Sequence, residues 1–114
     1  MRAVLCTEFG EPESLAVADV PDPVPGEGEV LIDVAAAGVN YPDTLTIRDM
    51  YQFKPPLPFS PGGELAGVVS SAGEGVGHLS EGDRVIALTG AAGGFAEKAV
   101  ADARKVIPVP DGMP

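Results

Sequence analysis

The most informative stretch of this chain is PGGELAGVV, at residues 61–69. Its apolar part begins after Glu64 and runs to Ser71, and the glycine-rich segment 73–77 follows it directly. A short apolar run that ends at clustered glycines is typical of a strand followed by a turn. The segment EGDRV at residues 81–85 then opens another apolar run, which predicts a second strand over residues 83–88.

Short apolar runs of the same kind occur on both sides of this stretch. They predict further strands over residues 1–6, 15–20, 29–34, 95–100 and 105–109. The chain also contains 15 glycines and 12 prolines, which leaves little room for long helices. Many short strands with turn signals between them indicate a mainly β fold, arranged as an antiparallel barrel or sandwich.

The segment that begins at Glu29 shows the clearest alternation. Val30, Ile32 and Val34 are spaced by two residues, so their side chains share one face of the predicted strand. We expect Ala36 to continue this apolar face. The acidic residues between them point to the opposite face.

One helix is predicted, beginning near Asn40. Asparagine is a favourable N-cap, Pro42 is tolerated in a first helical turn, and Asp43 suits the positive end of a helix. The sequence PPLP at residues 55–58 ends any helix firmly. The apolar side chains available to this helix are those of Leu45, Ile47 and Met50.

Size and charge restrict the classes of protein to consider. A chain of 114 residues is long enough for one domain with one core. Its formal net charge of −10 repels phosphate backbones, which argues against a nucleic-acid partner. No apolar run reaches the length of a membrane span or of a signal peptide, so we expect no membrane partner and a cytoplasmic protein.

The chain offers few ligands for a transition metal. Cys6 is the only cysteine and His78 the only histidine, and zinc sites draw mainly on these two residue types. Cys6 lies in an apolar run and is interpreted as a buried thiol, whereas His78 lies in a predicted surface turn. We therefore expect no metal site.

Neither glycine-rich segment matches a nucleotide-binding fingerprint. The motif Gly-X-Gly-X-X-Gly requires a glycine where His78 stands after Gly73, Gly75 and Gly77. The segment GAAGG at residues 90–94 has the wrong spacing and no lysine for a phosphate loop. Both segments are interpreted as turns.

Three polar residues stand where they could line a cleft. Glu64 opens an otherwise apolar strand, and its carboxylate could be either a hydrogen-bond acceptor at a cleft or a solvated strand end. Asn40 could serve in a cleft or only as a helix cap, with Asp43 next to it in the same turn. The residue pattern alone leaves these alternatives open.

Five short motifs, in this order and at this spacing, resemble the medium-chain dehydrogenase/reductase superfamily over nearly the whole chain. They are PGEGEVL (25–31), AGVN (37–40), PGGELAGVV (61–69), GDRV (82–85) and GFAE (94–97). The resemblance implies a GroES-like distorted β-barrel with one or two short helices. This fold agrees with the mainly β pattern of the residues.

Within the superfamily the chain resembles the zinc-free, quinone oxidoreductase-like branch. Asn40 stands where zinc alcohol dehydrogenases carry a catalytic cysteine, and Gly63 stands at their zinc histidine position. The lobe that carries four structural cysteines in the zinc enzymes is missing between residues 88 and 94. The resemblance therefore implies no zinc.

The same branch implies a set of cleft residues. Asn40, Asp43, Tyr51 and Glu64 match positions that line the cofactor and substrate cleft, and Arg48 matches a further one. The implied reaction is the NADPH-dependent reduction of a quinone or an enone. The resemblance does not assign a catalytic acid or base. Leu45 departs from the branch, many members of which carry a tyrosine near the nicotinamide at this position.

The resemblance implies that residues 1–114 are the N-terminal, substrate-side domain of such an enzyme, and they contain no sequence pattern for the Rossmann domain that binds the nucleotide. We therefore expect this chain to be inactive by itself and its parent enzyme to be a homodimer. Two alternatives are a standalone GroES-like binding module and a zinc-type alcohol dehydrogenase domain that has lost its metal. Gly63 and Asn40 argue against intact zinc chemistry.

Overall fold

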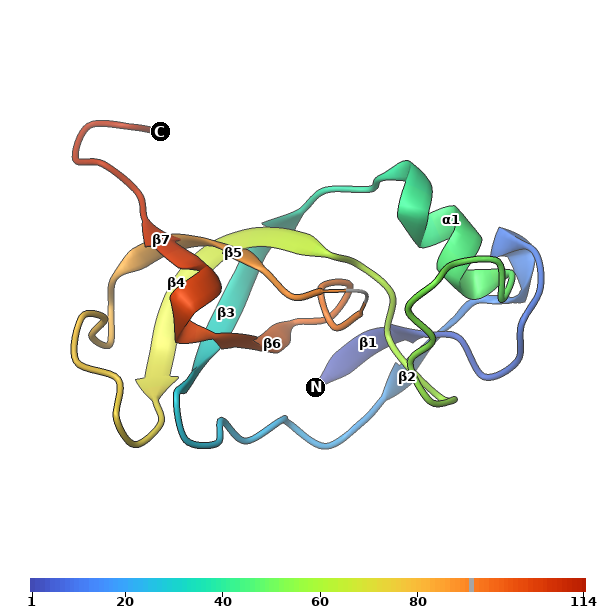
Figure 1. The fold of residues 1–114 in the computed structure, drawn as a ribbon, viewed down its shortest axis with the longest axis horizontal. Coiled ribbons are helices and arrows are strands. Elements are labelled where there is room, and N and C mark those ends of the chain that lie inside the picture. The colour runs from blue at the N-terminus through green and yellow to red at the C-terminus, as the bar shows by residue number, and fades with distance from the viewer. Residues whose placement is uncertain (91) are drawn as a thin grey trace.

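The computed structural model describes residues 1–90 and 92–114, and in it most of the regular structure is β-strand (Figure 1). In chain order the elements are β1 Arg2–Leu5, η1 Pro12–Ser14, β2 Ala16–Asp19, β3 Glu29–Ala37, α1 Tyr41–Ile47, β4 Glu64–Ala72, β5 Arg84–Leu88, β6 Lys98–Asp102, η2 Ala103–Lys105 and β7 Val106–Pro108. The prediction of a mainly β fold with a short helix is confirmed. The turn predicted over residues 90–94 includes Ala91, which lies outside the described residues.

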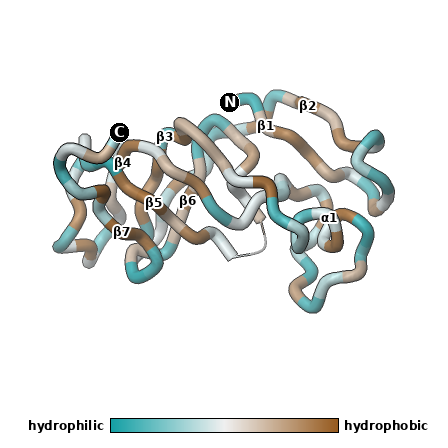
Figure 2. Tube along the Cα trace, turned by 90° about the horizontal axis from the view of Figure 1, so that it is seen from above, coloured by the Kyte–Doolittle hydropathy of each residue, from teal (hydrophilic) through white to brown (hydrophobic). Residues whose placement is uncertain are grey.

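Five strands form one antiparallel sheet in the order β6-β3-β4-β5-β7, and β1 pairs with β2 in a second sheet. Isolated backbone bridges join the β1 segment to the rest of the molecule: Ala3 pairs with Ala96, just before β6, and Cys6 pairs with Phe59, in the loop before β4. Helix α1 and the β1–β2 pair lie at one end of the molecule, whereas β7 lies at the other (Figures 1 and 2). The stretch around residue 64 thus supplies the central strand of the main sheet.

The core lies on one face of the curled five-stranded sheet. Val30 and Ile32 have no exposed surface, as the alternation predicted. Ala36 is exposed, so its predicted place on this face is wrong. The register between β3 and β4 shifts between Val34 and Ala36, and this irregularity turns Ala37 toward the core instead. A β-bulge of this kind is not visible in a strict two-residue alternation.

The remaining predicted strands are found with small changes of boundary. The strand expected over residues 95–100 begins only at Lys98. Glu97 O still accepts a hydrogen bond from Val34 N–H of β3 at 2.9 Å, but Phe95 O accepts from Val4 N–H of β1 at 2.8 Å. Within the predicted helix, Ile47 is buried but Met50 is 68% exposed. Met50 lies beyond the end of α1, so its predicted place on the apolar face of the helix is wrong.

Candidate functional site

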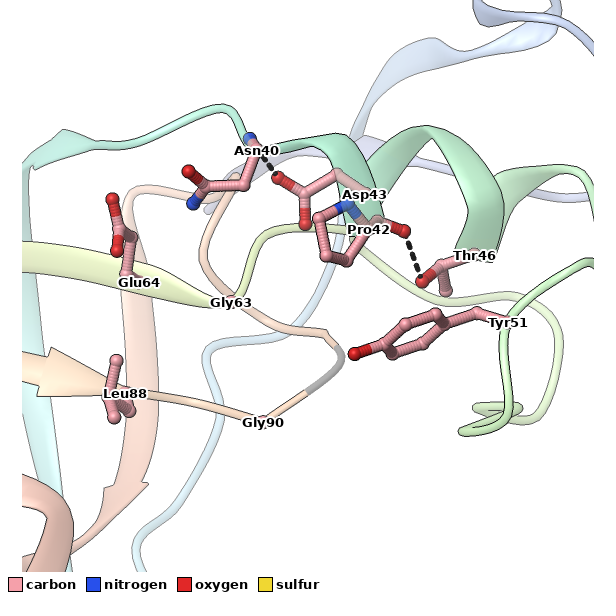
Figure 3. A pocket seen from close by; sticks show the side chains of 9 residues that line it. All are labelled: Asn40, Pro42, Asp43, Thr46, Tyr51, Gly63, Glu64, Leu88 and Gly90. Atoms are coloured by element: carbon pink, nitrogen blue, oxygen red, sulfur yellow. Dashed lines mark hydrogen bonds between the residues drawn. The ribbon is translucent and has the colours of Figure 1, made fainter.

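A cavity of about 390 Å³ opens where the start of α1, the start of β4 and the end of β5 meet (Figure 3). Its volume lies within the range of small-molecule sites. It is lined by Asn40, Pro42, Asp43, Thr46, Tyr51, Gly63, Glu64, Leu88 and Gly90. All four residues predicted to line a cleft are in this set: Asn40, Asp43, Tyr51 and Glu64.

The start of helix α1 places Asn40 and Asp43 at the cavity. The Asn40 backbone N–H donates a hydrogen bond to Asp43 Oδ2 at 2.8 Å, which is the side-chain half of a capping box. Asp43 is 7% exposed, and this bond offsets part of the cost of burying its carboxylate. Asn40 is exposed and its side chain turns toward Glu64 (Figure 3). Capping and cleft lining are therefore not exclusive roles here.

Glu64 opens β4 at the edge of the cavity. Its side chain is half-buried and lies in a space that Gly38 leaves free, since a Cβ at residue 38 would overlap the Glu64 carboxylate. Glu64 also lines an adjoining apolar groove of about 420 Å³, together with Leu88 and Ile86. The carboxylate thus stands between the polar cavity and an apolar surface, and it is not a fully solvated strand end.

Two glycines form the floor of the cavity. A Cβ placed on Gly63 would lie 2.7 Å from the carbonyl oxygen of Gly90, so the two backbone segments approach too closely for a side chain at residue 63. Thr89 supports this approach, because its hydroxyl donates to Gly62 O at 2.7 Å and its N–H donates to Gly63 O at 2.9 Å. Residue 63, which the resemblance equates with a zinc histidine position, therefore contributes only backbone to the cavity.

Tyr51 forms the opposite wall. It lies in the loop after α1, and its hydroxyl points into the space above Gly90 (Figure 3). Arg48, which the resemblance placed in the cleft, lies elsewhere: its Nη2 donates to Glu11 Oε2 at 2.7 Å. This pair raises the pKa of Arg48 and lowers the pKa of the Glu11 carboxyl. The expectation for Arg48 is corrected, because that guanidinium fastens α1 to the β1–β2 connection.

The remaining candidates for chemistry lie away from the cavity. Cys6 is 1% exposed and packs with Ile47 and Phe59, and burial raises the pKa of its thiol. His78 is exposed, and its Nε2 lies 3.2 Å from Ala103 O. Within residues 1–90 and 92–114, no three His, Cys, Asp or Glu side chains come together as metal ligands. The residues that line the cavity do not fit a zinc ligand set.

Sequence reasoning missed several residues of the cavity wall. Leu88 is the last residue of β5 and Gly90 follows that strand, whereas Pro42 and Thr46 belong to α1. No local signal marks Leu88 as a lining residue, because it reaches the cavity only through the pairing of Glu64 with Leu88 across β4 and β5. Thr46 is 2% exposed, and its hydroxyl donates to Pro42 O at 2.9 Å, which leaves it no free donor.

The chain combines a curled antiparallel sheet, a short helix and a cavity at the helix start that is floored by glycines. These features together are typical of one class of domain. Residues 26–111 match the family model of the alcohol dehydrogenase GroES-like domain. The chain belongs to this family.

Curated relatives and solved structures agree with this assignment. Quinone oxidoreductase from Rattus norvegicus is 41% identical over 114 residues, which are 99% of this chain and 35% of the relative. Escherichia coli quinone oxidoreductase, solved in complex with NADPH, matches all of this chain and 35% of its own with a TM-score of 0.93 and 31% identity. A mycobacterial protein solved with NADPH matches all of this chain and 35% of its own, with a TM-score of 0.91 and 40% identity. The chain thus spans about a third of the length of these relatives.

Proposed function

We propose that this chain is the N-terminal, acceptor-side domain of a zinc-independent, NADPH-dependent reductase of quinones or enones. The observation that carries the proposal is the cavity in which Asn40, Asp43, Tyr51 and Glu64 come together, in a domain similar to those of quinone oxidoreductases. In this proposal residues 1–114 form one domain. A Rossmann domain encoded outside them binds most of the nucleotide.

The charge of the cavity supports a particular orientation of NADPH in this proposal. Its described lining carries the carboxylates of Asp43 and Glu64 and includes no lysine or arginine. Carboxylates repel the phosphates of the cofactor, but they are compatible with a neutral carboxamide and with a ring that becomes cationic on oxidation. The residues present therefore suit the nicotinamide end and the acceptor, and the phosphates have to bind elsewhere.

The residues of the chain then act by binding and orientation. When bound, NADPH supplies the hydride, and the protein positions its ring against the acceptor. Asn40 offers an exposed amide that can bind a carboxamide or a carbonyl oxygen, and Tyr51 offers an aromatic face and a hydroxyl donor. The glycine floor lets a flat ring approach the backbone of β4 and β5. We assign no acid or base to these side chains.

The compartment and the assembly follow as parts of the same proposal. The described part of the chain contains no helix that is long and apolar enough to cross a membrane. We place the parent enzyme in the cytoplasm as a homodimer, and its partners are small molecules and not nucleic acids, as the net charge of −10 favours.

The test uses the complete gene product that contains this chain. NADPH oxidation is followed with a benzoquinone, a naphthoquinone and an enone, each with and without a zinc chelator. Chelator-insensitive reduction of any of these acceptors supports the proposal. Chelator-sensitive oxidation of simple alcohols, or no turnover with any acceptor, contradicts it. The 114-residue chain alone is the control, and we expect it to oxidise no NADPH.

A further inference from the structure

The loop that carries Tyr51 begins with an unusual helix end. Helix α1 closes with two hydrogen bonds, Asp49 N–H to Thr46 O at 3.2 Å and Met50 N–H to Leu45 O at 2.9 Å. This pattern is a Schellman motif, whose left-handed position is usually filled by glycine. Here Asp49 occupies it with φ of 60°. The motif fixes the direction in which the chain leaves the helix toward Tyr51.

An ion pair closes the same loop at its far end. Lys54 Nζ lies 2.7 Å from Asp49 Oδ1 and 3.1 Å from Asp49 O, so one ammonium group binds both the side chain and the backbone of the residue that starts the loop. The two ends of segment 49–54 are thereby held together. We call this pair the Asp49–Lys54 clip.

Phe53 packs against Tyr51 inside the closed loop. The centroids of the two rings are 5.9 Å apart with an interplanar angle of 55°, which is a favourable tilted arrangement for an aromatic pair. Phe53 is 59% exposed, so its ring contributes little to the core. Tyr51 is half-buried and faces the cavity, and Phe53 supports it from the side.

We propose that the Asp49–Lys54 clip and Phe53 are positioning elements that hold the Tyr51 ring as a fixed wall of the cavity and so set its preference for flat, ring-shaped acceptors. The inference rests on the proposed function for its acceptor. It assigns a role to Asp49, Phe53 and Lys54, none of which lines the cavity. A tyrosine on a free loop would lose conformational entropy each time an acceptor stacks on it, whereas a tyrosine held in advance avoids that cost.

The positioning is tested directly on this chain by fluorine NMR. The chain contains two tyrosines, so fluorotyrosine labelling gives one signal for Tyr51 and one for the exposed Tyr41, which serves as an internal control. We expect Lys54→Met and Phe53→Leu each to shift the Tyr51 signal and leave the Tyr41 signal in place. Lys54→Arg should preserve the wild-type signal. Lys105→Met, an exposed lysine in η2, is the matched control. Because the loss of the Phe53 ring current moves the Tyr51 signal by itself, Lys54→Met is the decisive variant, and an unmoved Tyr51 signal there overturns the positioning.

The effect on acceptor choice is tested in the complete gene product. An exposed ion pair is worth about 0.2–1 kcal/mol, which corresponds to a rise of roughly 1.4- to 5-fold in the KM for a naphthoquinone in Lys54→Met. We expect kcat to change less than about twofold, and Phe53→Tyr to keep the wild-type KM that Phe53→Leu loses. If the wild type is active and both Lys54→Met and Phe53→Leu keep its KM, this inference is overturned and the proposed function stands. An inactive wild type overturns the proposed function, and the fluorine signal still decides whether the loop holds Tyr51.

Discussion

The space between Gly38 and Glu64 provides a direct test of the site geometry. A Cβ at residue 38 would lie 3.0 Å from both Cγ and Cδ of Glu64 and would overlap its carboxylate. The φ of Gly38 lies outside the left-handed region, so the backbone at this position can accept alanine. The overlap with Glu64 is the expected source of strain. Gly38→Ala should therefore act by forcing the Glu64 side chain into another conformation.

The size of the effect follows from the cost of that displacement. An off-rotamer side chain costs about 0.5–1.5 kcal/mol, so we expect Gly38→Ala to lower the free energy of unfolding by about 1 kcal/mol. When Glu64→Ala is present the overlap disappears, and Gly38→Ala should be neutral or stabilising by up to about 1 kcal/mol, because it restricts the unfolded chain. The predicted coupling between the two substitutions is thus at least about 1 kcal/mol.

The assay is a double-mutant cycle measured by urea unfolding with circular dichroism. Gly77→Ala is the matched control, because a Cβ there meets no atom within 4 Å. It should be neutral or slightly stabilising in both backgrounds. If Gly38→Ala and Glu64→Ala add within about 0.3 kcal/mol, the two residues are not in contact and the position assigned to Glu64 in the cavity is refuted.

Three further predictions concern the helix cap, the core and an ion pair. Asp43→Ala should lower the free energy of unfolding by about 1 kcal/mol through loss of the bond to the helix start, whereas Asp43→Asn should lose less, as measured by urea unfolding. Ile32→Ala, at a fully buried residue, should cost about 2–5 kcal/mol, against about 0.5 kcal/mol or less for Ile107→Ala, which is 65% exposed, and equal losses would contradict the assigned core. The side chain of Arg104 lowers the pKa of Asp102 to about 2 from its ordinary 3.8. The stabilisation by this pair is present above pH 3.8 and is lost as the pH falls toward 2, so the melting-temperature difference between wild type and Arg104→Met should shrink over that interval.

The sheet could be predicted because its signals are local. The alternation in β3 and the glycine turn after β4 are each encoded by consecutive residues, and the structure contains both. The place of Ala36 could not be read in this way, because the bulge depends on the register with β4 and not on β3 alone. The prolines of residues 55–58 set only an outer limit for the predicted helix, whereas α1 ends at Ile47, because Asp49 adopts a left-handed conformation that is usually filled by glycine.

The site shows the same division between local and distant information. The residue pattern indicates Asn40 and Asp43 as a helix start and Glu64 as a carboxylate in an apolar run, but only the family resemblance, which also supplies Tyr51, assigns these residues to a cleft. Leu88 carries no such signal and enters the wall only through its pairing with Glu64. Arg48 is the opposite case: a motif position suggested the cleft, but an acidic partner 37 residues away, Glu11, holds its side chain elsewhere.

This contrast bears on how the site is specified. The polar residues of the cavity are positioned by regular secondary structure. The cap of α1 places Asn40 and Asp43, and Glu64 is the first residue of β4. The residue that gives the cavity an aromatic wall, Tyr51, lies in a loop and depends on side-chain contacts around it. If the proposed function holds, substitutions in segment 49–54 should change which acceptor the complete protein prefers without unfolding the sheet, whereas substitutions at the start of β4 should affect the site and the stability of the domain together.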